Sequence, residues 1–247
     1  MAAGMRQASA PVVVYVEEHS YPAPGWAEAL LLAHRQPWAA VAPVMANANP
    51  DSIIGWAHFF TDFGPHIEPA TAGASDQLPS HQTSYKRSVL ADYGPRLEEM
   101  LETEYFLHQD LVARGYRLYR EPAAVTHHLN VSLPLSHIQL EFYGGRGFGA
   151  ERARYGRWSI LRRLLYSIGG PLIPVVRLPR LIREIRRCGR QRELLPRILP
   201  ALIVGLTASA LGEATGYMFG EGAVRERRVS IELNRQRHLR SKEKAVA

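Results

Sequence analysis

The sequence predicts an α/β domain followed by a mainly α-helical, basic region, and three observations support this fold class. A β-branched and aromatic run, Val12 to Val16, is typical of a strand buried on both faces of a parallel sheet. Further apolar runs alternate with segments of helical spacing up to residue 132. Beyond that point, arginine-rich segments flank long apolar stretches. We therefore expect one domain over residues 1–132 and a helical region over residues 133–247.

Length and composition limit the class of protein. A chain of 247 residues, of which 46% are hydrophobic and 21% charged, can bury a full core and does not have the composition of a disordered protein. The single cysteine, Cys188, excludes an intramolecular disulfide and a cysteine-rich zinc site, and it fits a reducing compartment. No secretory signal is expected, because residues 1–11 contain no apolar segment of the required kind.

The net charge of +7 conceals an asymmetry between the two halves of the chain. Residues 1–128 contain 8 Lys and Arg against 14 Asp and Glu, whereas residues 129–247 contain 22 against 9. An acidic half is suited to holding a cation, and a basic half to meeting an anionic partner. A membrane surface, a nucleic acid and a phosphorylated substrate are the candidate partners.

Periodicity and turn residues predict the remaining elements of the first domain. In order, we expect a short amphipathic helix after Trp26, a buried strand from Trp38 to Met45, an aromatic-rich segment from Ile53 to Phe63, a loop over residues 64–80, a helix beginning near Lys86, a strong helix from Leu97 to Gly115, and short strands from Tyr116 to Tyr119 and from Ala123 to Thr126. The loop is long enough to suggest a function.

Potential metal ligands lie where the first strand ends. Glu17, Glu18 and His19 follow the apolar run, and the prolines and glycine of residues 22–25 prevent the strand from continuing. In open α/β sheets, ligands bind at the carboxyl edge of the strands. This segment is therefore either a metal site or an acidic turn that caps a strand.

Four further segments stand in a specific order: Pro24-Gly25-Trp26 after the acidic residues, Ser80 to Arg87, Glu104 at the head of a helix that ends in Gly115-Tyr116, and Pro122 to His128. In this order they resemble the second half of the catalytic domain of family 2 glycosyltransferases, the inverting enzymes with the GT-A fold. The family's nucleotide-binding first half has no counterpart, so we expect an N-terminally shortened member with a partial, Rossmann-like sheet. Glu17, His19, Gln82 and Glu104 replace the residues usual in the family.

The resemblance implies metal-dependent transfer of a sugar from a nucleotide-sugar donor to a cell-envelope or lipid-linked saccharide. It assigns Glu17, His19 and His128 to the metal, Mg²⁺ or Mn²⁺, and Glu104 to the role of catalytic base. The residues assigned to donor or acceptor binding are Glu18, Gln82, Lys86, Arg87 and Trp56. From the residues alone, Glu104 fits a solvated helix carboxylate, Trp56 a core residue, and one of His127 and His128 a packed strand-end histidine.

The apolar stretches of the basic half favour a membrane surface. Leu164 to Val176 is uncharged over 13 residues, which is too short to span a bilayer but suits insertion in the membrane plane. Ile198 to Gly220 is long enough to span, yet Glu213, Pro200 and several glycines favour a re-entrant or interfacial helix pair, with a buried helix of a soluble domain as the alternative. The residues expected to contact the membrane are Leu164, Leu165, Leu172, Ile173, Val175, Arg162, Arg163 and Arg177.

The sequence therefore predicts a glycosyltransferase at the cytoplasmic face of the cell membrane, bound peripherally or by a re-entrant segment. A non-catalytic membrane-surface or scaffold descendant of such an enzyme is the first alternative. A nucleic-acid-binding protein is the second. No nucleic acid is expected as a partner, because the arginines are interleaved with Leu, Ile and Pro rather than with exposed aromatic residues. The glycine-rich segment Phe142 to Ala150 lacks the βαβ context of a dinucleotide loop.

Overall fold

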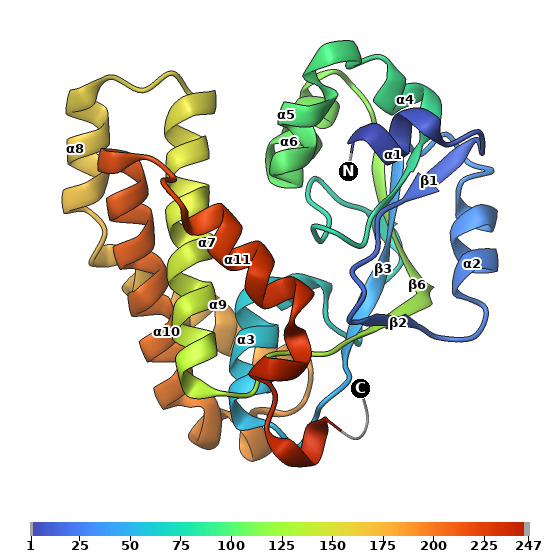
Figure 1. Cartoon of the computed structure of the whole chain (residues 1–247). Helices are drawn as coiled ribbons and strands as arrows, with labels where there is room; N and C mark the ends of the chain where they lie inside the picture. The colour runs from blue at the N-terminus through green and yellow to red at the C-terminus, as the bar shows by residue number, and fades with distance from the viewer. Residues whose placement is uncertain (1, 245–247) are drawn as a thin grey trace. The chain divides into compact units, whose positions relative to one another are not determined.

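The computed structural model describes residues 2–244 and shows a mixed α/β protein, 60% helical, with a curled mixed sheet and a helical C-terminal region. The chain forms two compact units (Figure 1). The sheet unit comprises the chain up to Ala46 together with Pro65–His128, and the helical unit comprises Asn47–Gly64 together with the chain from Leu129 onward. Segments far apart in sequence therefore build each unit.

Six strands form the sheet, in the order β1-β5-β3-β6-β2, with β4 paired to β6. Their bounds are β1 Val12–Val14, β2 Ser20–Pro22, β3 Ala40–Asn47, β4 Gly73–Ala74, β5 Ser84–Lys86 and β6 Leu118–His128. The predicted buried strand is β3, whose residues from Ala40 to Met45 are all buried. The two short strands predicted after Gly115 are one continuous strand, β6.

The first strand differs from its prediction. β1 ends at Val14, pairs only with β5, and does so antiparallel, so it is an edge strand and not one buried in a parallel sheet. Val14 is 36% exposed. A β-branched run favours any extended strand, and its place in the sheet depends on partners that lie about seventy residues away, which the run itself does not encode.

Short helices accompany the sheet. Their bounds are α1 Ala2–Gln7, α2 Trp26–Ala33, α4 Arg87–Ala91, α5 Leu97–Glu102 and α6 Glu104–Ala113. Two 3-10 turns, Gly64–His66 and Gly94–Arg96, lie between them in sequence. The strong helix predicted from Leu97 to Gly115 is interrupted at Thr103, whose backbone is extended (φ −137°, ψ 94°). The interruption makes Glu104 the first residue of α6.

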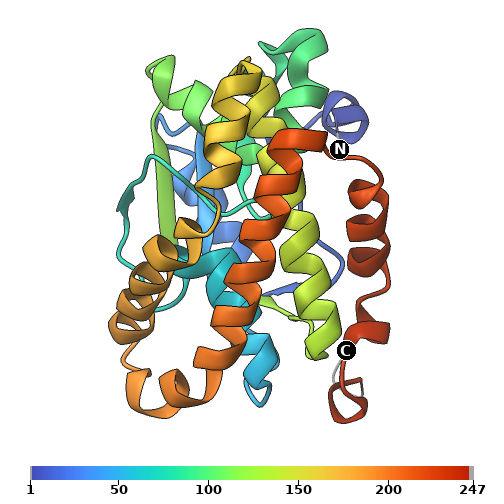
Figure 2. The same ribbon diagram turned by 90° about the vertical axis from the view of Figure 1, so that its left-hand side faces the viewer.

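The helical unit is built from six α-helices of the described chain, α3 Ile53–Phe63, α7 Pro134–Tyr155, α8 Ile160–Ile168, α9 Leu172–Arg187, α10 Gln191–Phe219 and α11 Val224–Leu233, followed by two 3-10 turns. Helix α10 packs along α7 and also contacts α3, α8 and α9 (Figure 2). The aromatic segment from Ile53 to Phe63 is thus a helix of this unit and not part of the first domain. Ser52 caps it by accepting a hydrogen bond from the Gly55 amide.

Residues 198–220 do not form the predicted re-entrant or interfacial pair, because residues 198–219 belong to the single helix α10. The glycines that suggested a break instead allow close packing against α7. A Cβ atom at Gly212 would collide with the Phe142 carbonyl oxygen, and one at Gly216 with that of Arg146. The glycine-rich segment from Phe142 to Ala150 lies in α7 and supplies the matching positions on the other helix.

Candidate active site

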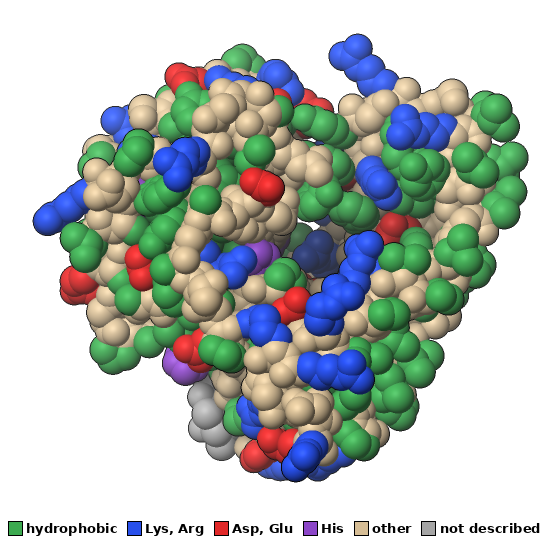
Figure 3. Space-filling view, turned by 180° about the vertical axis from the view of Figure 1, so that it is seen from behind, with side chains coloured by type: hydrophobic (Ala, Val, Ile, Leu, Met, Phe, Trp, Pro, Cys, Tyr) green, Lys and Arg blue, Asp and Glu red, His purple; other side chains and the backbone are tan. Residues whose placement is uncertain are grey.

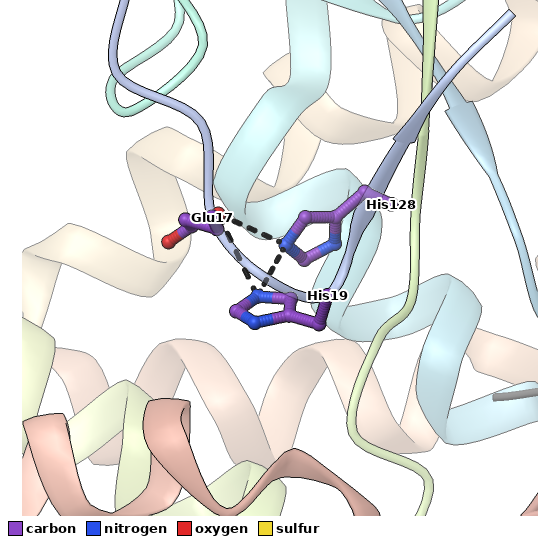
Figure 4. Close-up of side chains that lie close together, drawn as sticks. All are labelled: Glu17, His19 and His128. Carbon is purple, nitrogen blue, oxygen red and sulfur yellow. Dashed lines mark hydrogen bonds and ion pairs between the residues drawn. The ribbon is translucent and has the colours of Figure 1, made fainter.

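Glu17, His19 and His128 converge in the sheet unit, as the sequence predicts (Figure 4). Strand β2 pairs antiparallel with the end of β6, with Ser20 opposite His128, and this register brings His19 beside His128. The two Nε2 atoms are 3.1 Å apart, and Glu17 Oε2 lies 3.6 Å from His19 Nε2 and 3.4 Å from His128 Nε2. Three donor atoms from two separate segments therefore face one point.

The separations of these donor atoms suit a metal ion. Donor atoms about 2.0–2.3 Å from one ion at tetrahedral or octahedral angles lie about 3.0–3.7 Å from each other. Both imidazoles are buried, and Gln82 holds the carboxylate by donating to Glu17 Oε2 (3.3 Å) and to Ser20 Oγ (2.8 Å). Two imidazoles and one carboxylate favour Mn²⁺ or another first-row ion over Mg²⁺.

Positive charge on the neighbouring histidines stabilises the Glu17 carboxylate. Burial alone would raise the pKa of Glu17, but the hydrogen bond with His128 and the charges of His81, His128 and His19 hold that pKa well below its ordinary value. Glu17 is thus an anion at neutral pH, as a metal ligand must be.

Glu104 is not the solvated helix carboxylate that its local sequence suggests. Its side chain is fully buried, and its Oε1 accepts a hydrogen bond of 2.7 Å from the Tyr85 hydroxyl. Its Oε2 accepts from the His81 amide and lies 3.3 Å from His81 Nδ1. Burial raises the pKa of Glu104, although the charge of His81 and the hydrogen bonds from His81 and Tyr85 act in the opposite direction.

A chain of polar groups continues from Glu104 into the core. His108 Nε2 lies 2.7 Å from the Tyr85 hydroxyl, and His108 Nδ1 accepts from the Leu78 amide and the Gln77 side chain. These acceptor roles place the His108 proton on Nε2, so that it donates to Tyr85 and Tyr85 donates to Glu104. Burial lowers the pKa of His108 to about 3, which keeps its ring neutral.

His81 is the exposed end of this chain. Its ring is 24% exposed, its backbone has a φ of 61°, and Tyr15 packs against the ring edge-on at 5.5 Å. A non-glycine residue in the left-handed region costs free energy, and such strain is concentrated at functional sites. The charge of His81 lowers the pKa of both Glu17 and Glu104, so electrostatics link the metal-ligand cluster to the buried chain.

The other residues predicted to bind donor or acceptor have mixed placements. Gln82 lies at the cluster, where it contacts Glu17. Glu18, the residue after Glu17, is exposed. Lys86 Nζ donates to the Gln36 carbonyl and Arg87 Nε to the Ala10 carbonyl, so both are engaged with backbone elsewhere in the sheet unit. Trp56 is buried in the helical unit, where its indole stacks on Phe60 and donates to the Pro50 carbonyl, as expected of a core residue.

The residues predicted to contact a membrane lie on α8 and α9. Leu164, Leu165, Leu172 and Val175 are exposed, whereas Ile173 is half-buried. Figure 3 shows hydrophobic side chains gathered along the right-hand edge of the view, the side on which α8 lies. The described arginines are partly engaged: Arg162 lies over the Trp158 ring, Arg163 donates to the Trp158 carbonyl, and Arg177 pairs with Glu213 and Ser209.

Sequence reasoning missed the roles of Tyr85, His81 and His108. One signal was available, because His108 follows Glu104 by four residues and so shares its face of a helix. The position of Tyr85 depends on β5 pairing with both β1 and β3, which no local pattern shows. Comparison of the chain with protein-family models and with curated proteins found no match. Its function is therefore inferred from the geometry of its own side chains.

Proposed function

We propose that this protein is a metal-dependent inverting glycosyltransferase, similar to family 2 of those enzymes, which uses a nucleotide-sugar donor and a cell-envelope or lipid-linked saccharide acceptor. The convergence of Glu17, His19 and His128 is the observation that carries the proposal. It occurs at the positions that the resemblance assigns to the metal. The buried Glu104, at the position of the family's catalytic base, is electrostatically linked to the same cluster through His81 and gives further support.

The cluster of Glu17, His19 and His128 and the pair of His81 and Glu104 have separate roles in the proposed reaction. A divalent cation held by Glu17, His19 and His128 would neutralise the diphosphate that leaves. The acceptor hydroxyl must lose its proton as its oxygen bonds to the anomeric carbon and the bond to the diphosphate breaks. In our proposal the neutral His81 ring takes that proton, and the positive charge it then carries is the one that lowers the pKa of Glu17 and Glu104. Glu104 acts through His81, because its carboxylate faces Nδ1 and stabilises the imidazolium that forms.

His128→Ala is expected to weaken the response of the protein to Mn²⁺ by the share that the Glu17 cluster contributes, whereas His127→Ala is expected to preserve the full response. His127 is exposed next to the buried His128, so the two substitutions form a matched pair. Ligand at a hundredfold excess over its dissociation constant stabilises the folded state by about 2.7 kcal/mol. The measurement is the free energy of unfolding with and without Mn²⁺. Equal responses from the two variants would contradict the assigned ligand set.

A peripheral attachment to the cytoplasmic face of a membrane completes the proposal. Residues 151–192 contain 12 arginines and two acids, and each basic group near an anionic leaflet contributes about 1 kcal/mol. The exposed apolar side chains of α8 and α9 add a term that salt does not screen. Within residues 2–244, α10 is the one helix that is long and apolar enough to cross a membrane. Core helices of soluble proteins share that composition, and 44% of the most apolar 18-residue window of α10 is buried.

Flotation with anionic liposomes is expected to retain the protein at high salt, and Leu165→Glu with Val175→Glu is expected to abolish that retention. Leu233→Glu on α11 is the matched control, because Leu233 is as exposed as Leu165. A nucleic-acid-binding protein would instead leave the liposomes at moderate salt and bind an RNA or DNA competitor tightly. Hydrolysis of donor sugar by the bound protein separates an enzyme from a non-catalytic scaffold.

A further inference from the structure

A second group of potential metal ligands lies inside the helical unit. His58 comes from α3, and His137 and Glu141 lie one turn apart on α7. Glu141 Oε1 is 3.5 Å from His58 Nδ1 and 3.8 Å from His137 Nδ1, and the three donor atoms all lie within 4.8 Å of one another. All three residues are buried. No role in the proposed transfer reaction falls to them.

The protonation of His137 leaves a lone pair aimed at Glu141. His137 Nε2 lies 3.2 Å from the Ala201 carbonyl oxygen, which can only accept, so Nε2 carries the proton. Burial lowers the pKa of His137, which favours a neutral ring with Nδ1 unprotonated. Nδ1 is buried in a residue only 1% exposed and has no hydrogen-bond partner within the described residues 2–244. A lone pair facing a carboxylate is unfavourable unless a cation lies between them.

The surroundings of His58 match those of a metal-bound imidazole. Its Nδ1 faces Glu141, and its Nε2 lies 3.4 Å from Asp62 Oδ2. Metal-bound histidines commonly present their second nitrogen to a carboxylate or a backbone carbonyl. Here the second nitrogen of His58 faces the Asp62 carboxylate, and that of His137 faces the Ala201 carbonyl. The Thr61 hydroxyl bonds to Glu141 Oε1 and orients that carboxylate.

We propose that His58, His137 and Glu141 bind a divalent first-row metal ion, with Zn²⁺ the preferred ion, in the interior of the helical unit. Two imidazoles and one carboxylate are a common ligand set for Zn²⁺, with a water or the Thr61 hydroxyl available as a fourth ligand. The ion would join α3 to α7, which are brought from separate parts of the sequence. Helix α10 holds the site from a third side, since a Cβ atom at Gly205 would come within 2.5 Å of His137 Nε2. The proposal does not depend on the glycosyltransferase assignment.

The test is equilibrium dialysis of the metal-stripped full chain against Zn²⁺, with metal content measured per chain. Glu141→Gln is expected to bind one ion fewer than the wild type, whatever the Glu17 cluster binds. Asp62→Asn is expected to keep the ion but lose about 10–100-fold in affinity, the usual cost of removing a partner of a metal-bound histidine. His238→Gln, which alters a histidine of the same unit outside the cluster, is expected to behave as wild type.

A spectroscopic measurement tests the site without substituting His58, His137 or Glu141. In His128→Ala, which lacks a ligand of the other cluster, Co²⁺ is expected to give the visible absorption of a four-coordinate site with nitrogen and oxygen donors. Absence of a bound ion in this protein would overturn the proposal. So would a Glu141→Gln chain that is folded by circular dichroism and binds the same number of ions as the wild type with unchanged affinity.

Discussion

Glu104→Gln is expected to lower turnover by about 10²–10⁴-fold, the usual cost of losing general-base assistance. The substitution keeps the size of the side chain and its acceptor toward the Tyr85 hydroxyl. It removes the negative charge that faces His81 Nδ1 at 3.3 Å, so the imidazolium formed by proton transfer loses its stabilising partner. The measurement is kcat with saturating donor and acceptor.

Two comparisons distinguish proton transfer from a general effect of charge. Glu99→Gln removes an exposed carboxylate from the preceding helix and should leave turnover unchanged. His81→Gln should lower turnover about as much as Glu104→Gln, and the double substitution should cost little more, because the two residues act as a unit. Mn²⁺ binding should survive in all four variants. Equal losses from Glu99→Gln and Glu104→Gln would show that helix charge, and not stabilisation of the His81 imidazolium, was being altered.

The convergence of Glu17, His19 and His128 could be predicted, because strand ends restrict where side chains can lie. Glu17, His19 and His128 were assigned from the ends of apolar runs and from the resemblance, and antiparallel pairing of β2 with β6 brings them together. The buried strand β3 was equally readable, since an uninterrupted apolar segment has few other places in a fold. Local composition thus identified the central strand and the segments whose side chains converge.

The failures concern features set by distant partners. β1 has the composition of a central strand but lies at the edge, and α3 joins the helical unit although its neighbours in sequence belong to the sheet unit. Thr103 interrupts a segment whose apolar spacing is continuous. The cluster of His58, His137 and Glu141 combines α3 with α7, so the sequence shows at most two of its three members as neighbours, the pair four residues apart on α7.

The break predicted from the glycines of residues 198–220 is wrong for a different reason. Because glycine has low helix propensity, the glycines from Ile198 to Gly220 predict a broken helix. In the structure they mark where two helix backbones approach each other. Gly145 and Gly149 of α7 lie against the backbone of Ser209 and Glu213 of α10, and there is no space for a side chain at either position. Such packing between small residues occurs in soluble and membrane helices alike, so it does not decide the environment of α10.

Gly145→Ala is expected to destabilise the helical unit by about 1–3 kcal/mol, whereas Gly144→Ala is expected to stabilise it by about 0.4–1 kcal/mol. A Cβ atom at Gly145 would overlap the Ser209 carbonyl oxygen and lie 2.9 Å from its carbonyl carbon, and backbone atoms cannot move aside as a flexible side chain would. A Cβ atom at Gly144 meets no atom within 4 Å, so that substitution changes only helix propensity. The two positions are adjacent in one helix and the chemical change is identical. Urea denaturation followed by circular dichroism measures the difference, and stabilisation by both substitutions would mean that α7 and α10 are not in close backbone contact.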